Sequence, residues 1–182
     1  MKPDPFWQSL PPDADLPPAL RVLHGRTGRF SGQCHVTRGR GWVIALLLRL
    51  GRFPPAGGAV RVEIQIDRSA QEWIWDRSFN GHRTRSRLTY DHRRACVRED
   101  MGGLSLWLRP EFTDQCLSLR ILRVVVFGVP CPSILLPRSA TVEWQDDQGR
   151  FRFDVSAKLP GLGLLIRYRG HLIPVHAKTC AD

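Results

Sequence analysis

Residues Glu72 to Tyr90, EWIWDRSFNGHRTRSRLTY, combine aromatic side chains with four arginines in one short stretch. Aromatic rings that stack on bases, together with arginines that contact phosphates, are typical of a surface that binds single-stranded nucleic acid. Within the stretch, Asn80-Gly81 is a strong signal for a two-residue hairpin turn, with Phe79 and His82 as opposite neighbours. Because side chains alternate between the two faces of a strand, this register decides which of them can act together.

The predicted hairpin places aromatics and arginines on different faces. One face carries Trp73, Trp75, Arg77 and Phe79 opposite Leu88, Ser86, Thr84 and His82. The other face carries Arg83, Arg85 and Arg87 together with Asp76 and Glu72. Exposed ion pairs contribute at most about 1 kcal/mol each, so we interpret this second face as a solvated wall. A nucleic-acid partner is therefore disfavoured.

Arg77 is a charged side chain on the apolar face of this hairpin. If the preceding loop leaves Asp67 opposite Glu72, then Val62 lies beside Arg77. If the following loop leaves Thr89 opposite Arg94, then Ser86 faces Val97 and Thr84 faces Glu99. Arg77, Thr84 and Glu99 would then form one row, with the outer two about 9 to 10 Å apart at the backbone. Two interpretations stay open: a buried structural ion pair, or a polar spot inside a ligand cavity.

The second interpretation defines a candidate ligand cavity. Its predicted lining is Trp73, Trp75, Arg77, Phe79, Thr84, Ser86 and Glu99. We favour a non-enzymatic binding module for an apolar or amphipathic small molecule. The alternative is a small enzyme in which Glu99 acts as acid or base and Arg77 holds an anionic group. Whether the protein is an enzyme stays open.

Known catalytic and cofactor motifs give no support to the enzyme alternative. The chain lacks the G-x-S-x-G, Walker and H-E-x-x-H patterns, and GLGLLI at residues 161–166 lacks the third glycine of a dinucleotide-binding turn. The five cysteines are scattered and form no C-x-x-C pair, which is typical of free thiols in a reducing cytoplasm. The sequence predicts neither a cofactor nor a metal site.

The elements that must position these residues are mostly strands. Apolar and polar residues alternate from Val60 onward to Tyr168, while WVIALLLRL predicts one helix from Trp42 to Leu50, after a first strand within residues 28–39. We expect a mainly β fold of nine or ten strands, as a curved antiparallel sheet or half-open barrel. A further hairpin around QDDQG is expected to place Trp144 opposite Phe151 and Val142 opposite Phe153.

The chain of 182 residues predicts one β-rich domain over residues 20–174, after an irregular lead-in (1–19) and before a flexible tail (175–182). Its apolar runs are too short to span a bilayer, and the expected location is the cytoplasm. The formal net charge is +10, and all but three of the 27 basic residues are arginines. Such a charge permits nucleic acid, anionic lipid or an acidic protein as partner.

Several short motifs resemble a bacterial family of domains of unknown function, numbered 4166, collinearly from about Leu20 to Pro174. The motifs are W-x-R-x-F at Trp75, Arg77 and Phe79, E-x-x-G at Glu99 and Gly102, G-x-P-x-P at Gly128, Pro130 and Pro132, and Y-x-G at Tyr168 and Gly170. Cys131 stands where the family usually has an aliphatic residue. Members are sometimes fused behind saccharopine-dehydrogenase-like or epimerase-like domains. The resemblance thus implies an accessory or ligand-holding role beside an NAD(P)-dependent oxidoreductase, and it identifies no catalytic residue.

Overall fold

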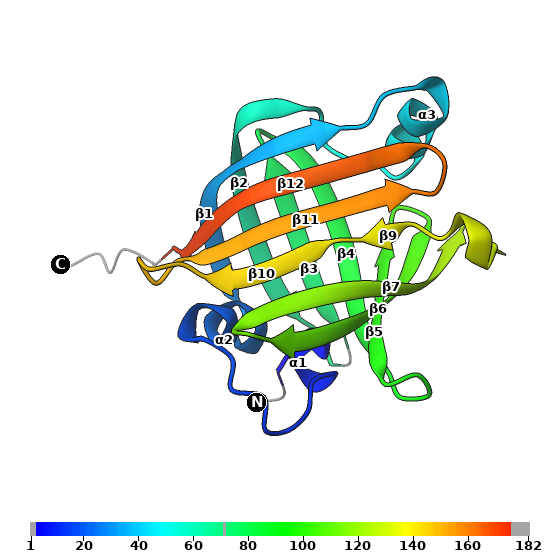
Figure 1. Ribbon diagram of the computed structural model, residues 1–182. Helices are drawn as coiled ribbons and strands as arrows, with labels where there is room; N and C mark the ends of the chain where they lie inside the picture. The colour runs from blue at the N-terminus through cyan, green and yellow to red at the C-terminus, as the bar shows by residue number, and fades with distance from the viewer. Residues whose placement is uncertain (1–2, 71, 176–182) are drawn as a thin grey trace.

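Antiparallel pairing in the computed structural model runs from strand to strand until the sheet closes on itself (Figure 1). The structure describes residues 3–70 and 72–175. Within them, the closed ring consists of β1 (Gly28–Arg38), β2 (Gly57–Arg68), β3 (Trp73–Phe79), β4 (His82–Asp91), β5 (Cys96–Met101), β6 (Leu104–Thr113), β7 (Cys116–Val126), β10 (Thr141–Gln145), β11 (Phe151–Leu159) and β12 (Gly163–Pro174). The short strands β8 (Val129–Pro130) and β9 (Arg138–Ser139) add to its rim.

Two pairings between distant segments close the barrel. β1 pairs with β12, and β10 pairs with β7 from Thr141↔Leu119 to Trp144↔Cys116. At the first junction, a side chain on Gly170 would meet the Gln33 carbonyl oxygen at 2.3 Å, so only glycine allows this approach of the strands. The predicted mainly β fold of nine or ten strands is confirmed, and the sheet is fully closed.

Helices lie at both ends of the barrel. α3 (Trp42–Leu50) has the predicted bounds and lies at one end, which we call the mouth. At the other end, the floor, α1 (Pro5–Gln8) and α2 (Pro18–Gly25) pack beneath the strands (Figure 1). The short 3-10 helix η1 (Ser133–Leu135) lies at the mouth.

The two floor helices were not predicted. α1 lies in the segment expected to be an irregular lead-in (1–19), and α2 begins at the end of that segment and lies mostly in the predicted β-rich domain. Prolines are compatible with the first turn of a helix, and both helices begin with one. The Asp4 side chain accepts the backbone N–H of Trp7 and caps α1, while α2 buries Leu20 and Leu23. The proposed domain limits stay a prediction, and residues 176–182 of the predicted tail lie outside the described residues.

The registers beside the Asn80-Gly81 hairpin differ from expectation. β3 and β4 pair as predicted, with Arg77 opposite Thr84. Each flanking loop has the expected four residues but occurs later in the chain, so that Ile64 rather than Val62 lies opposite Arg77, and Leu88 rather than Thr84 lies opposite Glu99. At the second loop, the Asp91 side chain accepts the backbone N–H groups of Arg93 and Arg94 in the middle of the turn, which fixes the loop there. Both shifts are even, so every side chain keeps its predicted face.

The predicted register of the β10–β11 hairpin differs from the observed one by one residue, and an odd shift reverses which side chains share a face. Glu143 lies opposite Phe153, and Trp144 lies opposite Arg152. The prediction that Trp144 faces Phe151 is therefore wrong. The side chain of Asp146 accepts the backbone N–H of Arg150 and sets a different turn from the one assumed. As a result, Glu143 points into the barrel and is buried.

Arg83, Arg85 and Arg87 are all exposed on the outer wall, and Arg85 pairs with Asp76 at 3.3 Å. Changing all three to glutamine should leave the circular-dichroism spectrum unchanged. It should change the free energy of unfolding by no more than about 1 kcal/mol, because surface substitutions and exposed pairs contribute little. Loss of soluble, folded protein in this variant would contradict the outward orientation of the arginine row.

Candidate functional site: a cavity inside the barrel

The barrel encloses a cavity of about 480 Å³. Its wall is predominantly apolar, with Phe6 and Leu23 at the floor and Val43, Leu47 and Leu162 at the mouth. Small-molecule sites typically measure about 300 to 1,000 Å³ and combine an apolar lining with a few polar groups. The cavity therefore has the size and character of a ligand site.

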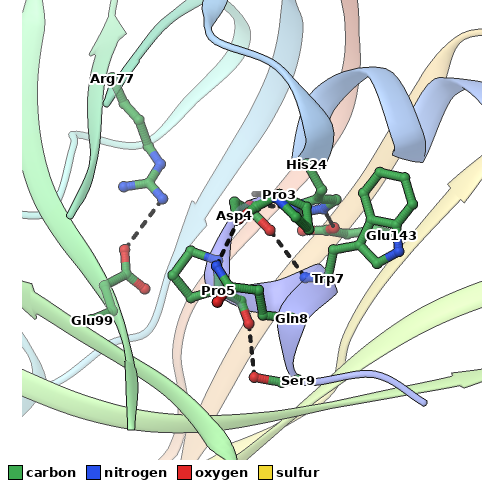
Figure 2. Close-up of polar contacts among 10 residues, drawn as sticks. All are labelled: Pro3, Asp4, Pro5, Trp7, Gln8, Ser9, His24, Arg77, Glu99 and Glu143. Atoms are coloured by element: carbon green, nitrogen blue, oxygen red, sulfur yellow. Dashed lines mark hydrogen bonds and ion pairs between the residues drawn. The ribbon is translucent and has the colours of Figure 1, made fainter. Parts of the chain in front are cut away.

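One charged pair lies on the cavity wall. Arg77 Nη2 donates to Glu99 Oε1 at 3.2 Å (Figure 2). Arg77 Nη1 donates to Ser86 Oγ at 2.6 Å. The guanidinium also lies 5.0 Å from the centre of the Trp75 ring, a cation–π arrangement. The side chains of Arg77 and Glu99 are only 19% and 10% exposed, so each charge depends on the other.

The structure brings most of the predicted cavity residues together. Five of the seven line the cavity, namely Trp75, Arg77, Phe79, Thr84 and Glu99. The other two, Trp73 and Ser86, are buried, and Ser86 takes the bridging position that was expected of Thr84. The contact between Arg77 and Glu99 is present although the β4–β5 register differs, because the arginine extends along the barrel interior rather than straight across the strands.

Tyr168 adds a further polar group to this wall. Its ring stacks on Phe79 with 5.4 Å between the ring centres. Burial raises the pKa of the Tyr168 hydroxyl, which therefore stays neutral over the ordinary pH range. The polar part of the cavity thus contains the Arg77–Glu99 ion pair, neutral hydroxyl groups and one further carboxylate, that of Glu143.

A second polar cluster, which sequence reasoning missed, joins the floor to the wall. His24 Nδ1 lies 2.7 Å from Asp4 Oδ2, and His24 Nε2 lies 2.9 Å from Glu143 Oε2 (Figure 2). His24 and Asp4 are fully buried. The backbone N–H of Asp4 donates to the His24 carbonyl at 2.8 Å, so the start of α1 is tied to α2. A correct β10–β11 register, with Glu143 inward, was the signal that could have revealed this cluster.

The two carboxylates determine the protonation of His24. Burial by itself lowers the pKa of a histidine, but the charges and hydrogen bonds of Asp4 and Glu143 outweigh it and raise the pKa of His24 to about 10. An imidazolium can donate from both ring nitrogens, which matches an acceptor on each side. The charged histidine therefore fastens α2 to α1 and to β10.

A family model described as a domain of unknown function, DUF4166, matches residues 16–172. The chain belongs to this family. In this DUF4166 domain the matched residues include α2, Arg77, Glu99 and Glu143, while α1 and Asp4 lie before them. None of the curated proteins compared with the chain matches it. No helix formed by the described residues is long and apolar enough to cross a bilayer.

A double-mutant cycle tests the pair in the DUF4166 cavity. Arg77→Met and Glu99→Gln should each cost about 3 to 5 kcal/mol of unfolding free energy, because each leaves a buried partner uncompensated. The double variant should be less destabilised than the sum of the two by more than about 1 kcal/mol. The exposed pair Arg85→Met and Asp76→Asn is the matched control and should couple by less than about 1 kcal/mol. Additive effects at Arg77 and Glu99 in urea unfolding would contradict the contact.

His24 should make the domain less stable as pH rises. Its folded-state pKa of about 10 lies above the ordinary value of 6.5, so its stabilisation is complete below pH 6.5 and is lost as pH rises toward 10. Between about pH 7 and pH 8.5, the free energy of urea unfolding should fall by up to about 1.4 kcal/mol per pH unit from this group. His24→Gln should remove that component, whereas His171→Gln should retain it. In NMR spectra the His24 ring should stay protonated at pH 8 in the folded protein and lose its proton in urea.

Proposed function

We propose that this domain binds an apolar or amphipathic small molecule inside the barrel, with the polar group of that molecule beside Arg77 and Glu99. The observation that carries the proposal is the cavity of about 480 Å³, which has a predominantly apolar lining and the Arg77–Glu99 pair among the few polar groups of its wall. An apolar body would be removed from water along the wall, and each buried methylene would favour binding by about 0.8 kcal/mol.

The polar end of the ligand is expected to carry a hydrogen-bond acceptor. A guanidinium has five N–H groups, and the hydrogen bonds to Ser86 and Glu99 use two of them in Arg77. The indole Nε1 of Trp75 is buried and has no acceptor among the described residues. A carbonyl, hydroxyl or carboxylate oxygen placed beside Arg77 would meet the guanidinium N–H groups that these two hydrogen bonds leave. Because Glu99 already balances Arg77, a neutral acceptor suits the site at least as well as an anion.

The alternative of a small enzyme places Glu99 as acid or base. Glu99 lines the cavity, which would let it reach a bound molecule, but its carboxylate accepts a hydrogen bond from Arg77 and is held by it. This arrangement favours holding a ligand over transforming it. An accessory role beside an NAD(P)-dependent oxidoreductase, as the family resemblance implies, agrees with a protein that holds an amphipathic substrate for a separate catalyst.

Filling the cavity should abolish binding without unfolding the protein. Leu106 and Ala157 both line the cavity, so Leu106→Phe with Ala157→Phe should weaken binding of dodecanol and dodecanoate by about tenfold or more. The added rings would occupy space that the alkyl chain needs, and each methylene left unburied costs about 0.8 kcal/mol of binding. Ala59→Phe, on the exposed face of β2, is the matched control and should bind as the wild type does. Displacement of anilinonaphthalene sulfonate measures affinity, and native mass spectrometry measures the ratio of ligand to protein.

The same assay separates the alternatives. Wild-type protein that binds neither dodecanol nor dodecanoate, or a filled variant that binds them equally well, would contradict the cavity proposal. Turnover of a bound amphipath that is lost in Glu99→Gln while binding persists would establish the enzyme alternative instead.

A further inference from the structure

The mouth of the barrel carries an unusual concentration of exposed apolar side chains. Among the described residues, ten large apolar side chains are exposed, and eight of them belong to segments at the mouth. They come from α3, the β7–β8 turn, β8, η1 and the β11–β12 turn, which lie at the same end of the barrel (Figure 1). We call this set the apolar rim: Trp42, Leu46, Leu50, Phe127, Val129, Ile134, Leu135 and Leu162.

In α3 the exposed apolar side chains form a regular outer face of the helix. Its inner face is used fully, since Ile44 and Leu48 are buried and Val43 and Leu47 line the cavity. Its outer face carries Trp42, Leu46 and Leu50, spaced four residues apart, with Trp42 80% exposed. A helix that is apolar all round is normally buried, whereas a surface helix has a polar outer face. The outer face of α3 therefore requires a second apolar environment.

The charge around the rim has a single sign. The mouth segments 39–56, 127–140 and 160–163 contain no aspartate or glutamate, and they include the exposed arginines Arg40, Arg49, Arg52 and Arg138. The floor segments differ, since they contain Asp13, Asp15, Asp114, Asp146 and Asp147. A positive rim repels a second copy of itself, so the charge opposes self-association through this surface and favours an anionic partner.

We propose that the apolar rim docks on the surface of a lipid bilayer that contains anionic lipid. Apolar side chains would enter the boundary between headgroups and acyl chains, Trp42 would lie at the level that tryptophan prefers, and the four arginines would contact lipid phosphates. A nucleic acid offers the same phosphates but no apolar layer for eight exposed side chains. A bilayer supplies both features at once.

Docking in this orientation would turn the cavity toward the membrane. Leu135 and Leu162 belong to the apolar rim and also line the cavity, so the apolar surface is continuous from the rim into the barrel. The membrane proposal stands on the rim alone and does not require an occupied cavity. If the cavity also binds an amphipath, this continuity gives the molecule an apolar route between bilayer and barrel.

Vesicle flotation tests the docking. Wild-type protein should float with vesicles of phosphatidylcholine and phosphatidylglycerol, float much less with phosphatidylcholine alone, and lose binding as salt is added. Trp42→Ser with Ile134→Ser should reduce binding about tenfold or more, as should the triple change of Arg40, Arg49 and Arg52 to glutamine. These variants change exposed positions, and circular dichroism verifies that they are folded.

Matched controls remove two exposed apolar side chains, or three exposed arginines, from the floor. Ile173→Ser with Val175→Ser, and the change of Arg26, Arg29 and Arg93 to glutamine, should bind vesicles as the wild type does. The Leu106→Phe and Ala157→Phe variant should also bind vesicles, which separates docking from cavity binding. Equal losses of vesicle binding in rim and floor variants would overturn the proposal. So would wild-type protein that does not bind vesicles containing phosphatidylglycerol. A rim-dependent dimer, or rim-dependent binding to nucleic acid in place of vesicles, would overturn it in favour of that partner.

Discussion

A closed ring of ten strands is wider than its own inward side chains can fill. Barrels of eight strands are just wide enough for side chains to pack the interior or to hold one small ligand, and the diameter grows with each added strand. Here the extra interior space is filled by helices at one end and stays open toward the other. At the floor, α1 and α2 enter the space and bring Phe6 and Leu23 into contact with it. Toward the mouth the space stays open as the cavity, with α3 beside it.

The charged groups inside the barrel form two clusters, one on the cavity wall and one at the floor. Arg77 and Glu99 neutralise each other on the wall, and the His24 imidazolium lies between two carboxylates where the floor joins β10. Each cluster is compensated internally, so an apolar interior can contain them. Arg77 and Glu99 both line the cavity, whereas in the second cluster only Glu143 does, and His24 and Asp4 are buried beneath it. The second cluster holds the floor against β10, and the first leaves a charged pair on the cavity wall.

Local signals determined how much of this arrangement could be predicted. Asn80-Gly81 specified one hairpin completely, and even-numbered errors in the adjoining loops left Arg77 and Glu99 on the correct face. A one-residue error at the Asp146 turn reversed the faces of β10 and concealed Glu143, and with it the partner of His24. The floor helices could not be predicted because prolines precede and begin both of them, and such a proline-rich segment resembles a loop. Closure of the barrel could not be predicted either, since it depends on pairing between strands that are distant in sequence.

The pairing of β1 with β12 has a consequence for how the protein is made. β1 begins at Gly28 and pairs with a strand that ends at Pro174, so one edge of β1 has no partner until nearly all of the described chain has been synthesised. The other edge of the growing sheet is the strand most recently added, such as β7 before β10 pairs with it. During translation the growing sheet therefore presents two unpaired edges and an apolar inner face at once, the combination that promotes strand-to-strand aggregation. Chaperone protection of the nascent chain should matter most in the interval before the last strand emerges.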